Sequence, residues 1–283
     1  MKTLLVLVKS LVNSEKYIEY SLKLAADLKY NVQIFYVHNP KTIPLASPQL
    51  DGAAIAQLNK ASEERVREAI RSLSAITDTL IYKIAGQVIV EVTAAIGDEI
   101  SMINEKVDSG DVQMVMIESQ GIRSFSLQES FSKEVIRKVN CPVWVIPENS
   151  DYNSILSVIY ATDYNEEDIP TLKKLIDLTY FNSPKISAIH ITDNVDFDLR
   201  IKNAGFQKML ESKVEYENIE VKALVENHGD DMVGLINTYA ARTSADLIVV
   251  LKENRRFLER LFKPGSSEKI IGETNRPVLV FHV

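Results

Sequence analysis

One cysteine and four histidines are the side chains of this chain best suited to nucleophilic or metal chemistry. Cys141 directly precedes Pro142 in a strand-like run, and no histidine is near it in sequence, so we expect a buried, inert thiol. The histidines do not share the spacing of a metal site, and we expect each to be satisfied in the fold or to face solvent: His38, His190, His228 and His282.

Catalytic motifs are missing from the sequence as well. It contains no G-x-S-x-G elbow, no Walker A lysine loop and no paired-carboxylate arrangement. We therefore expect no catalytic residue, no metal and no enzymatic activity.

The chain repeats itself, and the repeat sets where candidate site residues fall. LVLVK at 5–9 matches IYATD at 159–163 with an offset of 154, whereas GD at 97–98 matches GD at 229–230 with an offset of 132. The difference indicates 22 extra residues in the first copy, in the segment from 39 to 86. The predicted copies span 1–148 and 152–283.

Within each copy, short apolar runs alternate with helix-patterned segments. Strands are predicted near 3–9, 32–37, 88–95, 112–117, 142–147, 154–161, 185–191, 219–226, 246–251 and 277–283. Helices are predicted near 13–29, 51–76, 98–109, 127–139, 166–180, 197–213, 231–243 and 266–274. Runs such as LIVVL are continuously apolar, as strands covered on both faces require. Each copy is thus predicted to be a doubly wound, parallel, five-stranded α/β domain.

Ligands of such folds bind beyond the carboxyl ends of the strands, where the strand order reverses. The first strand ends at Lys9 in the first copy and at Asp163 in the second. Asp163 is a candidate binding residue, and its alternative role is that of a helix-capping or loop acid.

Three blocks of the second copy resemble the universal stress protein family: VIYATD at 158–163, ADLIVVL at 245–251 and GSSEKIIGETNRPVLVF at 265–281. The first copy is similar at lower fidelity, through LLVLVK and FSKEVIRKVNCPVWVI. The resemblance covers nearly the whole chain as a tandem pair. It implies the fold of the adenine nucleotide alpha hydrolase-like proteins.

Some members of this family bind ATP, and the resemblance supplies a partial test for the second copy. In the members that bind ATP, an aspartate ends strand one. Strand four is followed by the pattern G-x-x-G, then nine residues, then G-[ST]. The glycines are needed because a residue without a side chain lets backbone amides approach the phosphates closely. The resemblance implies these cofactor-binding residues: Asp163, Gly265, Ser266 and Ser267. Lys252 and Arg255, however, occupy the two glycine positions, and Gly265-Ser266-Ser267 can instead be a helix N-cap.

The first copy departs further from the ATP-binding pattern. Lys9 replaces the strand-one aspartate, and Glu118 replaces the first glycine of G-x-x-G. Ser130-Phe131 replaces the final Gly-Ser. We predict that the first copy has lost ATP binding, which leaves ATP as a candidate cofactor of the second copy only.

Charge and hydrophobicity exclude some partners. The net charge is −7 and no basic segment dominates, which argues against nucleic-acid binding. The initial apolar run ends at Lys9, and no stretch is long enough to cross a bilayer, so we expect a cytoplasmic protein without a membrane partner.

Each copy ends in an apolar strand, VWVI and VLVF, which would promote aggregation if left unpaired. We expect these last strands to pair within the molecule. Association of whole chains as a homodimer and an unidentified protein partner are further expectations. For the inserted segment three roles stay open: it covers the pocket of the first copy, it offers a surface to a partner, or it is a simple surface excursion.

The predicted function is that of a non-catalytic stress-response protein that acts by binding. Two alternatives remain at this point. One is an adenine-nucleotide-binding protein or weak ATP hydrolase that uses the second copy, and the other is a small-metabolite carrier.

Overall fold

The structure is a computed structural model that describes residues 2–40, 52–84, 87–119, 131–226, 232–254 and 276–282. The chain forms two compact units. The first contains residues 1–118, 138–141 and 149–152, and the second contains 119–137, 142–148 and 153–283.

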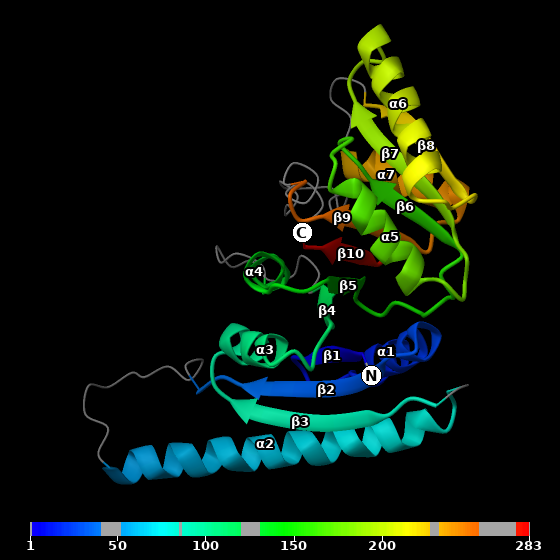
Figure 1. The fold of residues 1–283 in the computed structure, drawn as a ribbon. Helices are drawn as coiled ribbons and strands as arrows, with labels where there is room; N and C mark the ends of the chain where they lie inside the picture. Colours follow the sequence, from blue (N-terminus) through cyan, green and yellow to red (C-terminus); the bar gives the residue numbers. More distant parts are fainter. Residues whose placement is uncertain are drawn as a thin grey trace. The chain divides into compact units, whose positions relative to one another are not determined.

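The first unit is a parallel sheet with the strand order β3-β2-β1-β4. Its elements are β1 (Thr3–Val8), α1 (Glu15–Leu28), β2 (Asn31–His38), α2 (Gly52–Ile81), β3 (Val90–Ile96), α3 (Glu99–Asp108) and β4 (Met114–Ser119). Helices α1 and α2 pack on each other and on β2, and α2 also runs along β3 (Figure 1). The order reverses between β1 and β4, as in a doubly wound fold.

The second unit has the strand order β5-β10-β9-β6-β7-β8. Its elements are α4 (Phe131–Lys138), β5 (Val143–Pro147), β6 (Ser157–Ala161), α5 (Asp168–Leu178), β7 (Lys185–Thr192), α6 (Phe197–Lys213), β8 (Ile219–Val225), α7 (Met232–Thr243), β9 (Leu247–Leu251) and β10 (Val278–Phe281). The five strands of the second copy are parallel, and β5 joins them antiparallel to β10. The predicted α/β class and tandem doubly wound architecture are confirmed.

The last strands of the two copies pair with each other, as predicted. Trp144 of β5 lies opposite Leu279 of β10, and both are at most 1% exposed. Because β5 pairs with β10, it is grouped with the second unit, so the compact units do not divide the chain where one copy ends and the next begins. The proposed copy boundaries at 148 and 152 therefore remain a prediction.

Burial explains why these segments form these elements. Strand β9 (LIVVL) is buried along its whole length, as expected for a strand covered on both faces. In α1, buried residues recur at helical spacing: Tyr17, Tyr20, Leu24 and Leu28. Asp98 caps α3 by accepting a 3.0 Å hydrogen bond from the amide of Ser101.

Part of the predicted insertion lies in a longer helix. Helix α2 has 30 residues, whereas α6, at the same place in the second copy, has 17. It continues beyond the predicted end at 76 because Leu73 and Leu80, two turns apart, are both fully buried. The predicted helix at 266–274 lies outside the described residues.

Candidate functional site

Asp163 follows the carboxyl end of β6 in the second unit, where the sequence predicted it. Its Oδ1 lies 3.4 Å from Nδ1 of His190, which comes from the neighbouring strand β7. The same Nδ1 lies 2.9 Å from the carbonyl oxygen of Thr162. A carbonyl can only accept a hydrogen bond, so Nδ1 of His190 carries a proton.

The contact with Asp163 changes the titration of His190. The hydrogen bond from His190 to Asp163 raises the pKa of the imidazole, and burial opposes that increase only in part. Because the Asp163 side chain is 46% exposed, its carboxylate can also be reached from solvent. The site therefore combines an accessible acid with a histidine that holds its proton to higher pH.

The loop after β6 is fixed by a buried carboxylate, Asp168, which is 1% exposed. It accepts hydrogen bonds from the Tyr160 hydroxyl at 2.7 Å, the Thr162 hydroxyl at 2.6 Å and the Asn165 amide at 2.9 Å. Burial raises the pKa of Asp168, and the hydrogen bonds from Thr162 and Tyr160 counteract this. The network holds the backbone on both sides of Asp163.

Aromatic side chains pack beside the Asp163–His190 pair. The backbone of Tyr164 is in the left-handed region, with a φ of 60°. Its ring centroid lies 4.7 Å from that of His190 and 5.2 Å from that of Phe206 in α6. Phe206 is buried, whereas Tyr164 and His190 are partly exposed, so these two rings can contact a ligand next to the exposed acid.

The other predicted residues of this site are only partly described. Gly265, Ser266 and Ser267 lie outside the described residues, as does Arg255, so their relation to Asp163 remains a prediction. Lys252 directly follows β9, and its amide donates a 2.8 Å hydrogen bond to the carbonyl of Phe281.

At the same position in the first unit, the strand-ending residue is Lys9. Its ammonium lies 3.2 Å from the carboxylate of Glu99, the first residue of α3, and both side chains are less than a third exposed. The cation that replaces the strand-one acid is therefore engaged within the protein.

Glu118 lies in β4 of the same unit, beside the buried Tyr17. The charge of Glu118 adds to the effect of burial in raising the pKa of Tyr17, whose hydroxyl donates a 2.9 Å hydrogen bond to the carbonyl of Met116. This edge of the first unit thus carries a fixed ion pair and a further carboxylate.

Cys141 is buried, as predicted, and burial raises its pKa to about 12, which leaves little thiolate at neutral pH. His282 donates from Nε2 to the carbonyl of Ile136 at 2.8 Å, whereas His228 lies outside the described residues.

Within the described ranges, no three His, Cys, Asp or Glu side chains are grouped closely enough to hold a metal ion. In the same ranges, no helix has both the length and the apolar character needed to cross a membrane.

Sequence reasoning missed the role of His190. The first copy has Tyr36 at the equivalent position, so the histidine is not repeated, and the sequence alone offers no reason to place it in a site. The topology could have indicated it. The first and second strands of a doubly wound sheet are neighbours and end at the same edge, so residues at their ends lie close together.

Comparisons with known proteins agree with this fold. Among solved structures, a universal stress protein from Archaeoglobus fulgidus DSM 4304 is 20% identical, with coverage of 99% of this chain and 98% of that chain and a TM-score of 0.62. The cytoplasmic domain of a prokaryotic cation chloride cotransporter is 11% identical, with coverage of 99% and 94% and a TM-score of 0.55. Likeness at these identities shows the fold alone.

No curated protein matches the chain. The model of the universal stress protein family matches it twice, at residues 1–147 and 156–282, which together are nearly the whole sequence. The chain therefore belongs to the universal stress protein family and carries two copies of its domain in tandem.

Proposed function

We propose that this chain is a cytoplasmic stress-response protein that acts by binding rather than by catalysis, and that its first copy has lost ATP binding. Family membership supports the stress-response role. The observation that carries the statement on ATP is the contrast at the end of strand one: Asp163 is half-exposed, whereas Lys9 is paired with Glu99 at 3.2 Å.

An adenine nucleotide presents hydrogen-bond donors on its ribose and base and dense negative charge on its phosphates. A carboxylate at the strand end can accept from the donors, which a lysine cannot do. In the first unit, Glu118 also adds negative charge in β4, close to the same edge. These features disfavour the family's ATP site in the first copy.

The second candidate function is nucleotide binding by the second copy, and it rests on the Asp163 carboxylate and the Tyr164 ring beside it. Lys252 and Arg255 take the sequence positions where the family's pattern has glycines, and long side chains at these positions are expected to hinder close approach of phosphates to the backbone. We therefore rank this function below binding of another ligand or partner.

Isothermal titration of the full chain with ATP and magnesium tests both statements, with Asp163→Ala and Lys9→Ala as a matched pair. We expect at most one ATP to bind per chain and no phosphate to be released. Any heat of binding should disappear in Asp163→Ala and stay unchanged in Lys9→Ala. An absence of binding also supports the proposal for the first copy. Two ATP molecules per chain, binding that only Lys9→Ala weakens, or steady phosphate release would overturn it.

A further inference from the structure

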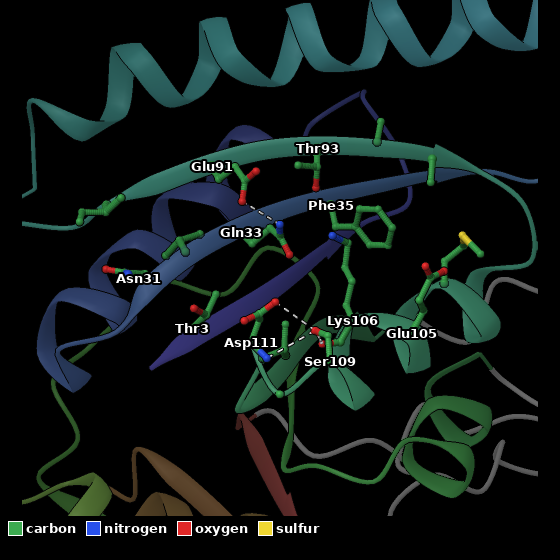
Figure 2. Close-up of a pocket in the computed structure, with 17 residues that line it drawn as sticks. Thr3, Asn31, Gln33, Phe35, Glu91, Thr93, Glu105, Lys106, Ser109 and Asp111 are labelled. Atoms are coloured by element: carbon green, nitrogen blue, oxygen red, sulfur yellow. Dashed lines mark hydrogen bonds between the residues drawn. The ribbon is translucent and has the colours of Figure 1, made fainter. Parts of the chain in front are cut away.

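A groove of about 850 Å³ lies on the first unit, and its lining does not include Lys9, Glu99 or Glu118 of the strand-end site. Figure 2 shows that its labelled side chains come from the starts of β1 and β2, from β2 and β3 along the sheet, and from α3 and the turn after it. The volume is in the range of small-molecule sites. The family's nucleotide position at the carboxyl edge does not include these residues.

The charged side chains of the groove are mainly acidic. Glu91 of β3 stands on one side, and Glu105 and Asp111 stand on the α3 side (Figure 2). Lys106 is the one basic residue of the lining, and its ammonium lies 4.7 Å from the centroid of the Phe35 ring. Three acids against one base favour a cationic ligand and disfavour a phosphate.

The second copy shows what the Glu91 position can bind. Strand register makes Glu91 equivalent to Glu220, because Glu91 lies opposite Gln33 and Glu220 lies opposite Ser187. Both carboxylates accept a hydrogen bond from that cross-strand partner, at 2.8 Å in the first copy and 2.9 Å in the second. The two carboxylates therefore have the same strand position and the same kind of cross-strand hydrogen bond.

Glu220 additionally binds two ammonium groups, those of Lys222 at 2.9 Å and Lys185 at 3.1 Å. Burial alone would raise the pKa of Glu220, but hydrogen bonds from Lys222, Lys185 and Ser187 outweigh it and lower the pKa to about 2. The fold thus places ammonium ions against this carboxylate in the second copy.

In the first copy both lysines are replaced by neutral residues. Asn31 occupies the position of Lys185, as the pairing of β1 with β2 and of β6 with β7 shows. Thr93 occupies the position of Lys222, as the pairing of β2 with β3 and of β7 with β8 shows. Both line the groove, and Asn31 Oδ1 and Thr93 Oγ1 are buried without a hydrogen-bond partner among the described residues. The first copy keeps the carboxylate and supplies neither of these two ammonium groups.

We propose that this groove binds a small aliphatic amine with two or more ammonium groups. One ammonium occupies the place that Lys222 takes in the second copy, against Glu91. The methylene chain follows the apolar part of the lining, and a second ammonium reaches one of the two carboxylates on the α3 side, Glu105 or Asp111.

Spermidine is the probe, titrated by calorimetry into the full chain at low salt, with an uncharged diol of matched length as ligand control. We expect one spermidine per chain, no binding of the diol, and a three- to tenfold loss of affinity, as a rough guide, in Glu91→Gln. Glu220→Gln is the matched control and leaves affinity unchanged, because its carboxylate is already occupied.

Thr93→Lys provides a second variant, since it supplies the missing ammonium from the chain itself. It is expected to weaken spermidine binding at least as much as Glu91→Gln while the circular dichroism spectrum and melting temperature are kept. The proposal is overturned by an absence of spermidine binding, by equal losses in Glu91→Gln and Glu220→Gln, by undiminished binding in folded Thr93→Lys, or by equal binding of the diol.

Discussion

Oδ1 of Asp163 lies 3.4 Å from Nδ1 of His190, so the acid that ends strand one of the second copy contacts the only histidine of the neighbouring strand. The hydroxyl of Thr162, directly before Asp163, donates a hydrogen bond to Asp168, and the carbonyl oxygen of Thr162 accepts a hydrogen bond from Nδ1 of His190. His190 thus contacts both Asp163 and the residue before it.

The first prediction concerns the titration of His190. Asp163→Asn removes the charge that stabilises the imidazolium, so the pKa of His190 should fall from above its usual value of about 6.5 toward that value. NMR titration of the histidine ring protons measures this, and Asp177→Asn, on an exposed position of α5, is the control. The raised pKa contributes stability below pH 6.5 that is lost as pH rises through the folded-state pKa. An unchanged His190 titration in Asp163→Asn would contradict the assignment.

His282 should titrate in the opposite direction. Burial lowers its pKa, and its buried Nδ1 has no hydrogen-bond partner among the described residues, so a proton there would be unsatisfied. Below about pH 6.5 the unfolded chain takes up a proton that the folded chain resists, and the free energy of unfolding therefore falls with acidification. Urea unfolding at pH 7.5 and 5.5 should show a smaller loss for His282→Gln, which keeps a donor for Ile136, than for the natural chain. Equal losses would show that His282 does not contribute.

Asp168→Asn should destabilise the second unit. An amide cannot accept all three hydrogen bonds that the carboxylate accepts from Tyr160, Thr162 and Asn165, and an unsatisfied buried group costs about 1–3 kcal/mol. Asp177→Asn on the exposed side of the same helix is expected to change stability by less than about 0.5 kcal/mol. Denaturant unfolding measures both variants, and similar midpoints for the two would refute a structural role of Asp168.

Much of the fold could be predicted because buried parallel strands are continuously apolar. Strand β9 was predicted at 246–251 and is found at Leu247–Leu251, and the apolar ends VWVI and VLVF correctly indicated the pairing of β5 with β10. Helix ends were harder to predict, since the burial of Leu80 that extends α2 depends on tertiary packing.

The candidate sites were only partly predictable. Asp163 could be located because it follows an apolar run, but its contact with His190 depends on which strands are neighbours. The equivalence of Glu91 and Glu220 was hidden because their offset is 129, which differs from the offsets of the recognisable motifs. Only strand register shows that they occupy the same place, since a shift of one residue would turn a side chain to the other face.

The pairing of the two last strands should depend on Trp144, the single tryptophan of the chain, which is 1% exposed and lies opposite Leu279. Trp144→Ala leaves a cavity between β5 and the neighbouring elements and should cost about 3–5 kcal/mol. Its control is Phe181→Ala, because that ring is 69% exposed and its removal should change stability by less than about 0.5 kcal/mol. Unfolding followed by circular dichroism compares the two variants, and the natural chain should show blue-shifted tryptophan emission that moves to the red on unfolding. If Trp144→Ala were as stable as Phe181→Ala, the pairing of β5 with β10 could not be a main contributor to the stability of the second unit.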